Sequence, residues 1–304
     1  MKKLLAIAVA AAITLPMTAM AETKVYGKGH VSLSSTKVGS ASASNWDAKS
    51  HASRIGFKGS NALDNGLTAT HKFEMGLDIA DPSGGLSGDR DAWVGLKGGF
   101  GEVRIGRHTL PSDLMDDAAD FTTHGSGLNG GGRANNALAY IGGFGNVGVA
   151  LARVQPGDVK DTAPDLESES VHDLMVNYSA GPIYAGVGVN APEGGKAGSK
   201  IALAYKGANF GVGLVAGKTT VSKKDEATND ADTFTTLSGK YSFGKAWVGG
   251  QFSKQKDSKK IENIVEAGYV LGKGTKAYGS YTIGGVDTSA GKTKTPRIGL
   301  IHVF

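Results

Sequence analysis

The sequence contains no cysteine. This absence excludes disulfide bonds, thiol nucleophiles and cysteine metal sites. The excess of positive charge is also small, because the sequence has 33 lysines and arginines and 28 aspartates and glutamates. Nucleic acid binding requires a concentrated basic face, so this weak excess argues against a nucleic acid partner.

The chain has little continuous apolar sequence. One apolar run, residues 4–15, is shorter than the roughly 20 residues of a membrane-spanning helix, and Pro16 follows it. Lys2 and Lys3 precede the run, and Ala19-Met20-Ala21 has the small-x-small pattern of a cleavage site. We therefore predict a cleaved signal peptide over residues 1–21 and a single domain over residues 22–304. Cleavage would leave 31 basic and 28 acidic residues, a formal charge of +3.

The abundant component is glycine, 47 of 304 residues, without a collagen period. The glycines accompany a second pattern, the alternation of apolar and polar side chains. In the stretch GLTATHKFEMGLDIA, residues 66–80, Phe73, Met75 and Leu77 alternate with Lys72 and Glu74. A period of two predicts a β-strand with one apolar and one polar face.

Sixteen segments show this alternation, and helical spacing is hard to find after residue 21. The predicted strands are 24–34, 50–59, 66–80, 89–98, 101–108, 134–142, 145–155, 170–180, 182–191, 199–207, 209–220, 232–243, 245–256, 260–272, 274–284 and 294–304. Short glycine or proline turns alternate with longer polar connections. A soluble β-sandwich also alternates, but its strands are usually about five or six residues long. Long strands in even number, with short turns at one end, indicate an all-β, antiparallel outer-membrane barrel. Sixteen strands leave a water-filled interior.

Five stretches together resemble the Gram-negative general porins, in order and across the mature chain. They are KVYGKGHVSLSS, SRIGFKGSNALDNGL, RDAWVGLKGGFGEVRIGRHTLP, GRANNALAYIGGFG and the terminal IGLIHVF. The resemblance implies a sixteen-stranded transmembrane barrel, usually a homotrimer, whose third loop folds inward to narrow the pore. It also implies basic side chains on the wall that face acidic side chains on that loop.

The resemblance assigns the basic wall to Lys28, Arg54, Arg90 and Arg133. The alternation supports this assignment for two of them, because Arg54 alternates with Ile55 and Phe57, and Arg90 has the opposite parity to Trp93. The same argument places Glu74 on the polar face, toward the lumen.

The longest connection, residues 108–133, stands where the family has its constriction loop. It carries the candidate acidic residues Asp113, Asp116, Asp117 and Asp120. If the loop folds inward, these carboxylates face the arginines across a slot and create a transverse electric field.

We therefore expect a passive diffusion channel in the outer membrane of a Gram-negative bacterium, which passes small hydrophilic solutes and ions and contacts outer-membrane lipid. A substrate-selective channel, a barrel enzyme and a structural outer-membrane protein are the alternatives. We predict no cofactor, and no metal, since the seven histidines show no clustered ligand spacing.

The chain ends on Phe304, in an alternating stretch that is expected to close the barrel by pairing with the first strand, around residues 24–34. In the resembled family, such a terminal aromatic residue is also recognised by the outer-membrane assembly machinery.

Overall fold

The computed structural model describes residues 22–81, 84–125, 127–129, 132–156, 169–223, 225 and 230–304. The predicted signal peptide, residues 1–21, lies outside the described residues, and its cleavage stays a prediction.

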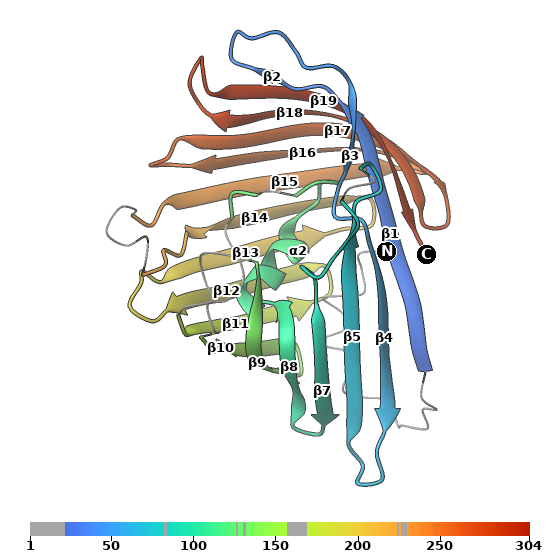
Figure 1. Cartoon of the computed structure of the whole chain (residues 1–304), viewed down its shortest axis with the longest axis vertical. Helices are drawn as coiled ribbons and strands as arrows, with labels where there is room; N and C mark the ends of the chain where they lie inside the picture. The colour runs from blue at the N-terminus through green and yellow to red at the C-terminus, as the bar shows by residue number, and fades with distance from the viewer. Residues whose placement is uncertain are drawn as a thin grey trace.

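Within those ranges, sixteen long strands form one antiparallel sheet that closes on itself (Figure 1). The long strands are β1 (Glu22–Ser34), β4 (Arg54–Ala62), β5 (Thr68–Leu77), β7 (Ala92–Gly98), β8 (Gly101–Thr109), β9 (Arg133–Phe144), β10 (Val147–Val154), β11 (Val171–Ala180), β12 (Ile183–Pro192), β13 (Gly198–Lys206), β14 (Phe210–Lys218), β15 (Thr233–Phe243), β16 (Ala246–Gln255), β17 (Lys260–Gly272), β18 (Thr275–Val286) and β19 (Lys292–Val303). Three short strands, β2 (Lys37–Val38), β3 (Asp47–Ser50) and β6 (Leu86–Ser87), extend the sheet near three of its connections. The predicted all-β fold with sixteen strands is confirmed.

The last strand closes the sheet against the first, as predicted. β19 pairs with β1 from Arg297 opposite Ser34 to Val303 opposite Lys28. The backbone N–H and C=O of Phe304 continue this ladder by bonding to Gly27 at 3.1 and 3.0 Å. Pairing of β1 with β19 satisfies the backbone groups that would otherwise form free edges of these two strands, which hydrocarbon strongly disfavours.

Most strand ends lie within three residues of the predicted ones, and two predicted strands are changed by an irregular backbone. The segment expected over 50–59 is divided into β3 and β4, because Ala52 has a φ of 49° and interrupts the extended backbone. The segment expected over 89–98 begins only at Ala92. Both irregular stretches place side chains of the candidate site.

The two faces of the sheet differ in chemistry. On β13, Ile201 and Leu203 are 45% and 47% exposed, whereas Lys200 and Ala202 are 7% and 0% exposed. The exposed face is apolar along the other strands too, with Leu174, Leu237 and Val265 as examples. An apolar outer face and a polar inner face are the arrangement of a barrel in lipid.

Glycines build the short turns. Gly181 and Gly244 have φ angles of 54° and 65°, in the left-handed region that other residues rarely adopt. Each begins a two-residue connection, β11 to β12 and β15 to β16. These turns hold neighbouring strands in register at one end of the barrel.

The connection from β8 to β9 contains the described helical segments η2 (Pro111–Asp113) and α2 (Leu114–Ala119). Figure 1 shows α2 inside the curve of the sheet, in front of β12 to β14. No described helix has the length and apolar character needed to cross a membrane.

Candidate functional site

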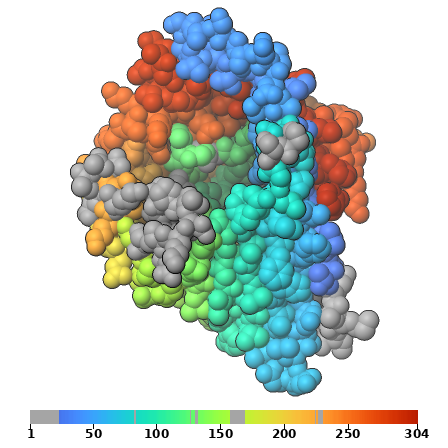
Figure 2. Space-filling view, in the orientation of Figure 1, coloured from blue at the N-terminus to red at the C-terminus, as the bar shows by residue number. Residues whose placement is uncertain are grey.

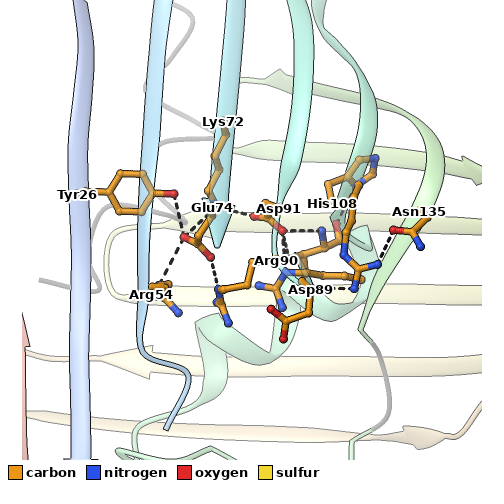
Figure 3. Close-up of polar contacts among 12 residues, drawn as sticks. Tyr26, Arg54, Lys72, Glu74, Asp89, Arg90, Asp91, His108 and Asn135 are labelled. Carbon is orange, nitrogen blue, oxygen red and sulfur yellow. Dashed lines mark hydrogen bonds and ion pairs between the residues drawn. The ribbon is translucent and has the colours of Figure 1, made fainter. Parts of the chain in front are cut away.

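Four basic side chains form what we call the basic cluster: Arg54 of β4, Lys72 of β5, Arg90 just before β7, and Arg133 of β9. Figure 3 shows Arg54, Lys72 and Arg90 around Glu74. Two buried carboxylates, Glu74 and Asp91, lie within the basic cluster. Four cations around two anions leave the cluster with a positive charge of two.

Glu74 joins three members of the basic cluster. Arg54 Nε and Lys72 Nζ lie 3.5 and 3.8 Å from Glu74 Oε2, and Arg90 Nε donates to Oε1. The Tyr26 hydroxyl donates to Oε2 at 2.9 Å. A carboxylate that is 5% exposed is costly without partners, so these contacts hold both it and the cations in place.

Asp91 contacts two members of the basic cluster, Lys72 and Arg133. Its Oδ2 lies 2.5 Å from Lys72 Nζ, and its Oδ1 lies 2.8 Å from Arg133 Nε. The Thr109 N–H and hydroxyl also donate to Oδ1, at 3.2 and 3.1 Å. Asp91 thus connects the basic cluster to the last residue of β8, where the connection to β9 begins.

The structure places Arg54, Arg90 and Glu74 on the polar face, but the prediction that Trp93 lies on the opposite face from Arg90 was wrong. Trp93 is 8% exposed and also lies on the polar face, with the Arg104 guanidinium carbon 4.0 Å from its ring centroid. Arg90 reaches Glu74 because the stretch before Ala92 is not a regular strand. Lys28 stands opposite Arg54 in the register of β1 and β4, at the margin of the basic cluster.

The connection between β8 and β9 packs against the polar face on the other side of the barrel. Met115 and Ala119 of α2 are fully buried against a cluster that includes Ala202, Val215 and Phe234. The Ser112 N–H and hydroxyl donate to the Asp173 carboxylate at 2.7 and 2.6 Å. The Asp173 side chain of β11 therefore fixes the beginning of the connection.

The later part of the same connection is bonded to β15, β16 and β17. The Ser238 hydroxyl donates to the Ala119 carbonyl at 2.6 Å, and the Thr122 hydroxyl donates to Gln251 Oε1 at 3.2 Å. The N–H groups of Thr123 and Gly127 donate to Glu266 and Glu262. The face of the molecule that Figure 2 shows is hollowed at its centre, and atoms coloured green lie inside the hollow.

The four candidate aspartates occupy different positions. Asp113 and Asp116 pair with Lys200 of β13, at 4.0 and 3.1 Å, rather than standing free before the arginines. Asp117 is exposed, on the side of α2 away from Met115. Asp120 accepts hydrogen bonds from the Thr122 N–H and hydroxyl, which shapes the turn after α2.

Burial raises the pKa of Asp113 and of Asp116, although the nearby Lys200 ammonium opposes the shift. Repulsion between the loop carboxylates adds to the effect of burial. The charge of this part of the connection therefore changes in a higher pH range than that of ordinary aspartates.

Sequence reasoning missed Lys72, Asp91 and Lys200. Alternation had already placed Lys72 on the polar face without assigning it to the site, and it could have suggested Lys200 in the same way, whereas Asp91 lies outside the regular part of β7. In the described ranges, no three histidine, aspartate or glutamate side chains are arranged to hold a metal ion.

A family model described as Gram-negative porin matches residues 6–288. Among curated relatives, the major outer membrane protein P.IB of Neisseria sicca is 42% identical over 124 residues, which are 38% of this chain and 33% of that protein. P.IB of Neisseria gonorrhoeae is 36% identical over 137 residues, 41% of this chain and 36% of that protein. The match thus spans about a third of the length of these relatives.

Two solved porin structures superpose on nearly the whole of this chain. An anion-selective porin from Comamonas acidovorans superposes with a TM-score of 0.73 at 22% identity, over 94% of this chain and 100% of that one. A mutant of Rh. blastica porin superposes with a TM-score of 0.72 at 19% identity, over 93% and 100%. At this identity, the two structures establish the fold alone.

Proposed function

The chain belongs to the Gram-negative porin family, and from that premise we propose that it is a passive, water-filled diffusion channel for small hydrophilic solutes and ions. As a closed sixteen-stranded barrel of this family, it is an outer-membrane protein whose apolar outer face contacts lipid. Porins are channels and not enzymes, so the alternative of a barrel enzyme is set aside.

The observation that carries the proposal is the division of one closed sheet into an apolar outer face and a charged inner face. Eight strands would leave an interior filled by side chains, whereas sixteen leave room for water. Charged groups such as Arg54 and Lys72, which are 30% and 23% exposed in their side chains, gain hydration from that water.

In this proposal the connection between β8 and β9 narrows the channel. The packing of Met115 and Ala119 against the inner face supports this role. The basic cluster would then form one side of the slot, and Asp117 and Asp120 would belong to the other. Opposite charges across a narrow gap create a transverse field, which favours polar solutes that can orient in it.

We also propose three features that the family resemblance implies: assembly into a homotrimer, cleavage of a signal peptide after residue 21, and recognition of the strand ending at Phe304 by the assembly machinery. The Phe304 side chain is 62% exposed, which supports its accessibility to a partner. The Gly27 backbone beneath it leaves space for the ring, since a Cβ there would lie 2.3 Å from Phe304 Cζ.

Uptake of neutral sugars of increasing size into liposomes that contain the purified protein tests the proposed function. A general diffusion channel gives uptake that falls smoothly with solute size and rises linearly with concentration. A substrate-selective channel gives uptake that saturates for one solute. Liposomes that stay impermeable to the smallest sugars would contradict both.

A further inference from the structure

Three of the seven histidines meet at one point on the inner face. His30 belongs to β1, His51 to the break between β3 and β4, and His124 to the connection between β8 and β9. The ring centroid of His30 lies 4.8 Å from that of His51 and 5.1 Å from that of His124. The ring centroids of His51 and His124 are 4.7 Å apart. We call these three residues the histidine cluster.

Hydroxyl groups connect the histidine cluster to the wall. The Tyr278 hydroxyl of β18 lies 2.8 Å from His30 Nε2 and 3.1 Å from His124 Nε2. The Ser32 hydroxyl of β1 lies 2.7 Å from His51 Nε2. A neutral imidazole has one donor and one acceptor nitrogen, so it can accept from one hydroxyl or donate to another. Neutral rings can therefore make all three contacts.

The main chain beside His124 is fixed by a compact turn. Asp120 accepts the two bonds from Thr122 described above, and the Gly125 N–H donates to the Thr122 hydroxyl at 3.2 Å. The Thr123 N–H lies 3.0 Å from both Glu266 oxygens. Two sets of contacts therefore hold residues 120–125 against the barrel wall. One is the hydrogen bonds to β16 and β17, and the other is the packing of the His124 ring.

The surroundings of the histidine cluster disfavour added positive charge. His30 is 1% exposed, so a charged ring there would lose most of its water. Two positive groups, Arg297 on β19 and Lys28 on β1, lie near His51. On β17, Glu266 lies near Tyr278 and Glu262 lies near Arg297. Both glutamates already accept from backbone N–H groups of the connection.

We propose that the histidine cluster is an acid-sensitive latch, which holds residues 120–125 against the wall while its rings are neutral and releases them when the rings take up protons. A free imidazole is protonated near pH 6.5. Protonation is less favourable when residues 120–125 are held than when they are released. The free-energy preference for the held conformation is therefore complete above about pH 6.5 and is lost as the pH falls below that value. At about pH 5, each ring that is protonated only after release raises the ratio of released to held protein by up to about thirtyfold.

The latch controls the position of residues 120–125, a property separate from the proposed channel function. The cysteine-free chain allows a direct test with two spin labels, on Gly127→Cys and Lys256→Cys. A Cβ at Gly127 would meet nothing closer than 3.7 Å, and Lys256 is exposed in the connection between β16 and β17. We expect one narrow label distance at about pH 8, and a broader, shifted distribution at about pH 5.

His124→Gln in the labelled protein removes the ring that belongs to the connection and keeps a polar side chain. We expect it to abolish most of the pH response, whereas the matched control His172→Gln, at an exposed position on β11, keeps it. His51→Gln gives an independent second variant. An unchanged distance distribution between pH 8 and 5, or a full response in both His124→Gln and His51→Gln, would overturn the latch, whether or not the barrel conducts.

Discussion

The Lys200 ammonium lies 3.1 Å from Asp116 Oδ2, so a cation on β13 pairs with helix α2. Lys200 is 7% exposed and also reaches Asp113 at 4.0 Å. Consequently Asp113 and Asp116 share one counter-charge, Lys200, whereas Asp117 is an exposed carboxylate of α2.

Lys200→Met should shift ion selectivity toward cations. The substitution keeps most of the side-chain volume and removes one positive charge beside two carboxylates. A unit charge at about 4 Å in water is worth about 1 kcal/mol, so the permeability ratio should change by about fivefold at most. The measurement is the reversal potential in a salt gradient at about pH 8.

Lys206→Met is the matched control for Lys200, because it makes the same change at an exposed position of the same strand. We expect it to leave the reversal potential near that of the unaltered protein. Equal reversal potentials for the two variants would show that Lys200 does not set the charge of the slot.

Arg54→Glu combined with Arg90→Glu should also shift selectivity toward cations, and more strongly, because it changes the basic cluster by four charges. Arg54→Gln with Arg90→Gln should move it in the same direction by about half as much. Lys245→Glu with Lys273→Glu makes the same formal change in two short turns. An identical shift in this control would mean that total charge, rather than the basic cluster, determines selectivity.

Acidification should make the channel more selective for anions. Because burial raises the pKa of Asp113 and Asp116 above the ordinary range near 4, protons bind these carboxylates as the pH falls from about 8 to 5. Protonation leaves the Lys200 charge uncompensated. Reversal potentials across this range test the sign, and Asp113→Asn with Asp116→Asn should flatten the curve. A shift toward cations on acidification would contradict the argument.

Gly213→Ala should disturb the connection between β8 and β9. A Cβ at Gly213 would lie 2.0 Å from the Ala119 carbonyl oxygen, so the end of α2 has to move away from the wall. Overpacking of this kind costs about 1–3 kcal/mol, and we expect a lower midpoint of thermal unfolding with a changed conductance.

Gly239→Ala on the neighbouring strand β15 is its control, since a Cβ there would meet nothing closer than 3.5 Å. It should leave both quantities nearly unchanged. If the two variants behave alike, the contact with Ala119 does not position α2.

Deletion of Phe304 should reduce the amount of protein in the outer membrane more than it reduces the conductance of the channels that form. The ladder of β1 and β19 keeps its pairs from Arg297 to Val303 without this residue. Surface labelling compared with single-channel conductance separates the two effects. Normal surface levels after deletion would contradict a role of Phe304 in assembly.

Alternation predicted most of the fold, because each strand of a barrel must present one face to lipid and the other to water. It placed Glu74 and Arg54 on the polar face and closed β19 on β1. It failed where the backbone departs from a regular strand, as at Ala52 and before Ala92.

Parity also cannot distinguish a lipid-facing tryptophan from one held inside by a cation. Trp93 under Arg104 is one case, and Trp247 is another, at 4% exposure with Lys240 Nζ 4.0 Å from its ring centroid. The pairing of Lys200 with Asp116 and the meeting of His30 with His124 join residues 84 and 94 positions apart. Such contacts depend on where a long connection packs, which local sequence patterns do not encode.

Conductance of the purified protein in planar bilayers shows whether the protein forms a passive, water-filled channel. A passive, water-filled barrel predicts discrete current steps whose size rises linearly with voltage and with salt concentration, together with a stable reversal potential in a salt gradient. A correctly folded, β-rich protein that inserts into the bilayer and produces no such steps would contradict the proposed channel function.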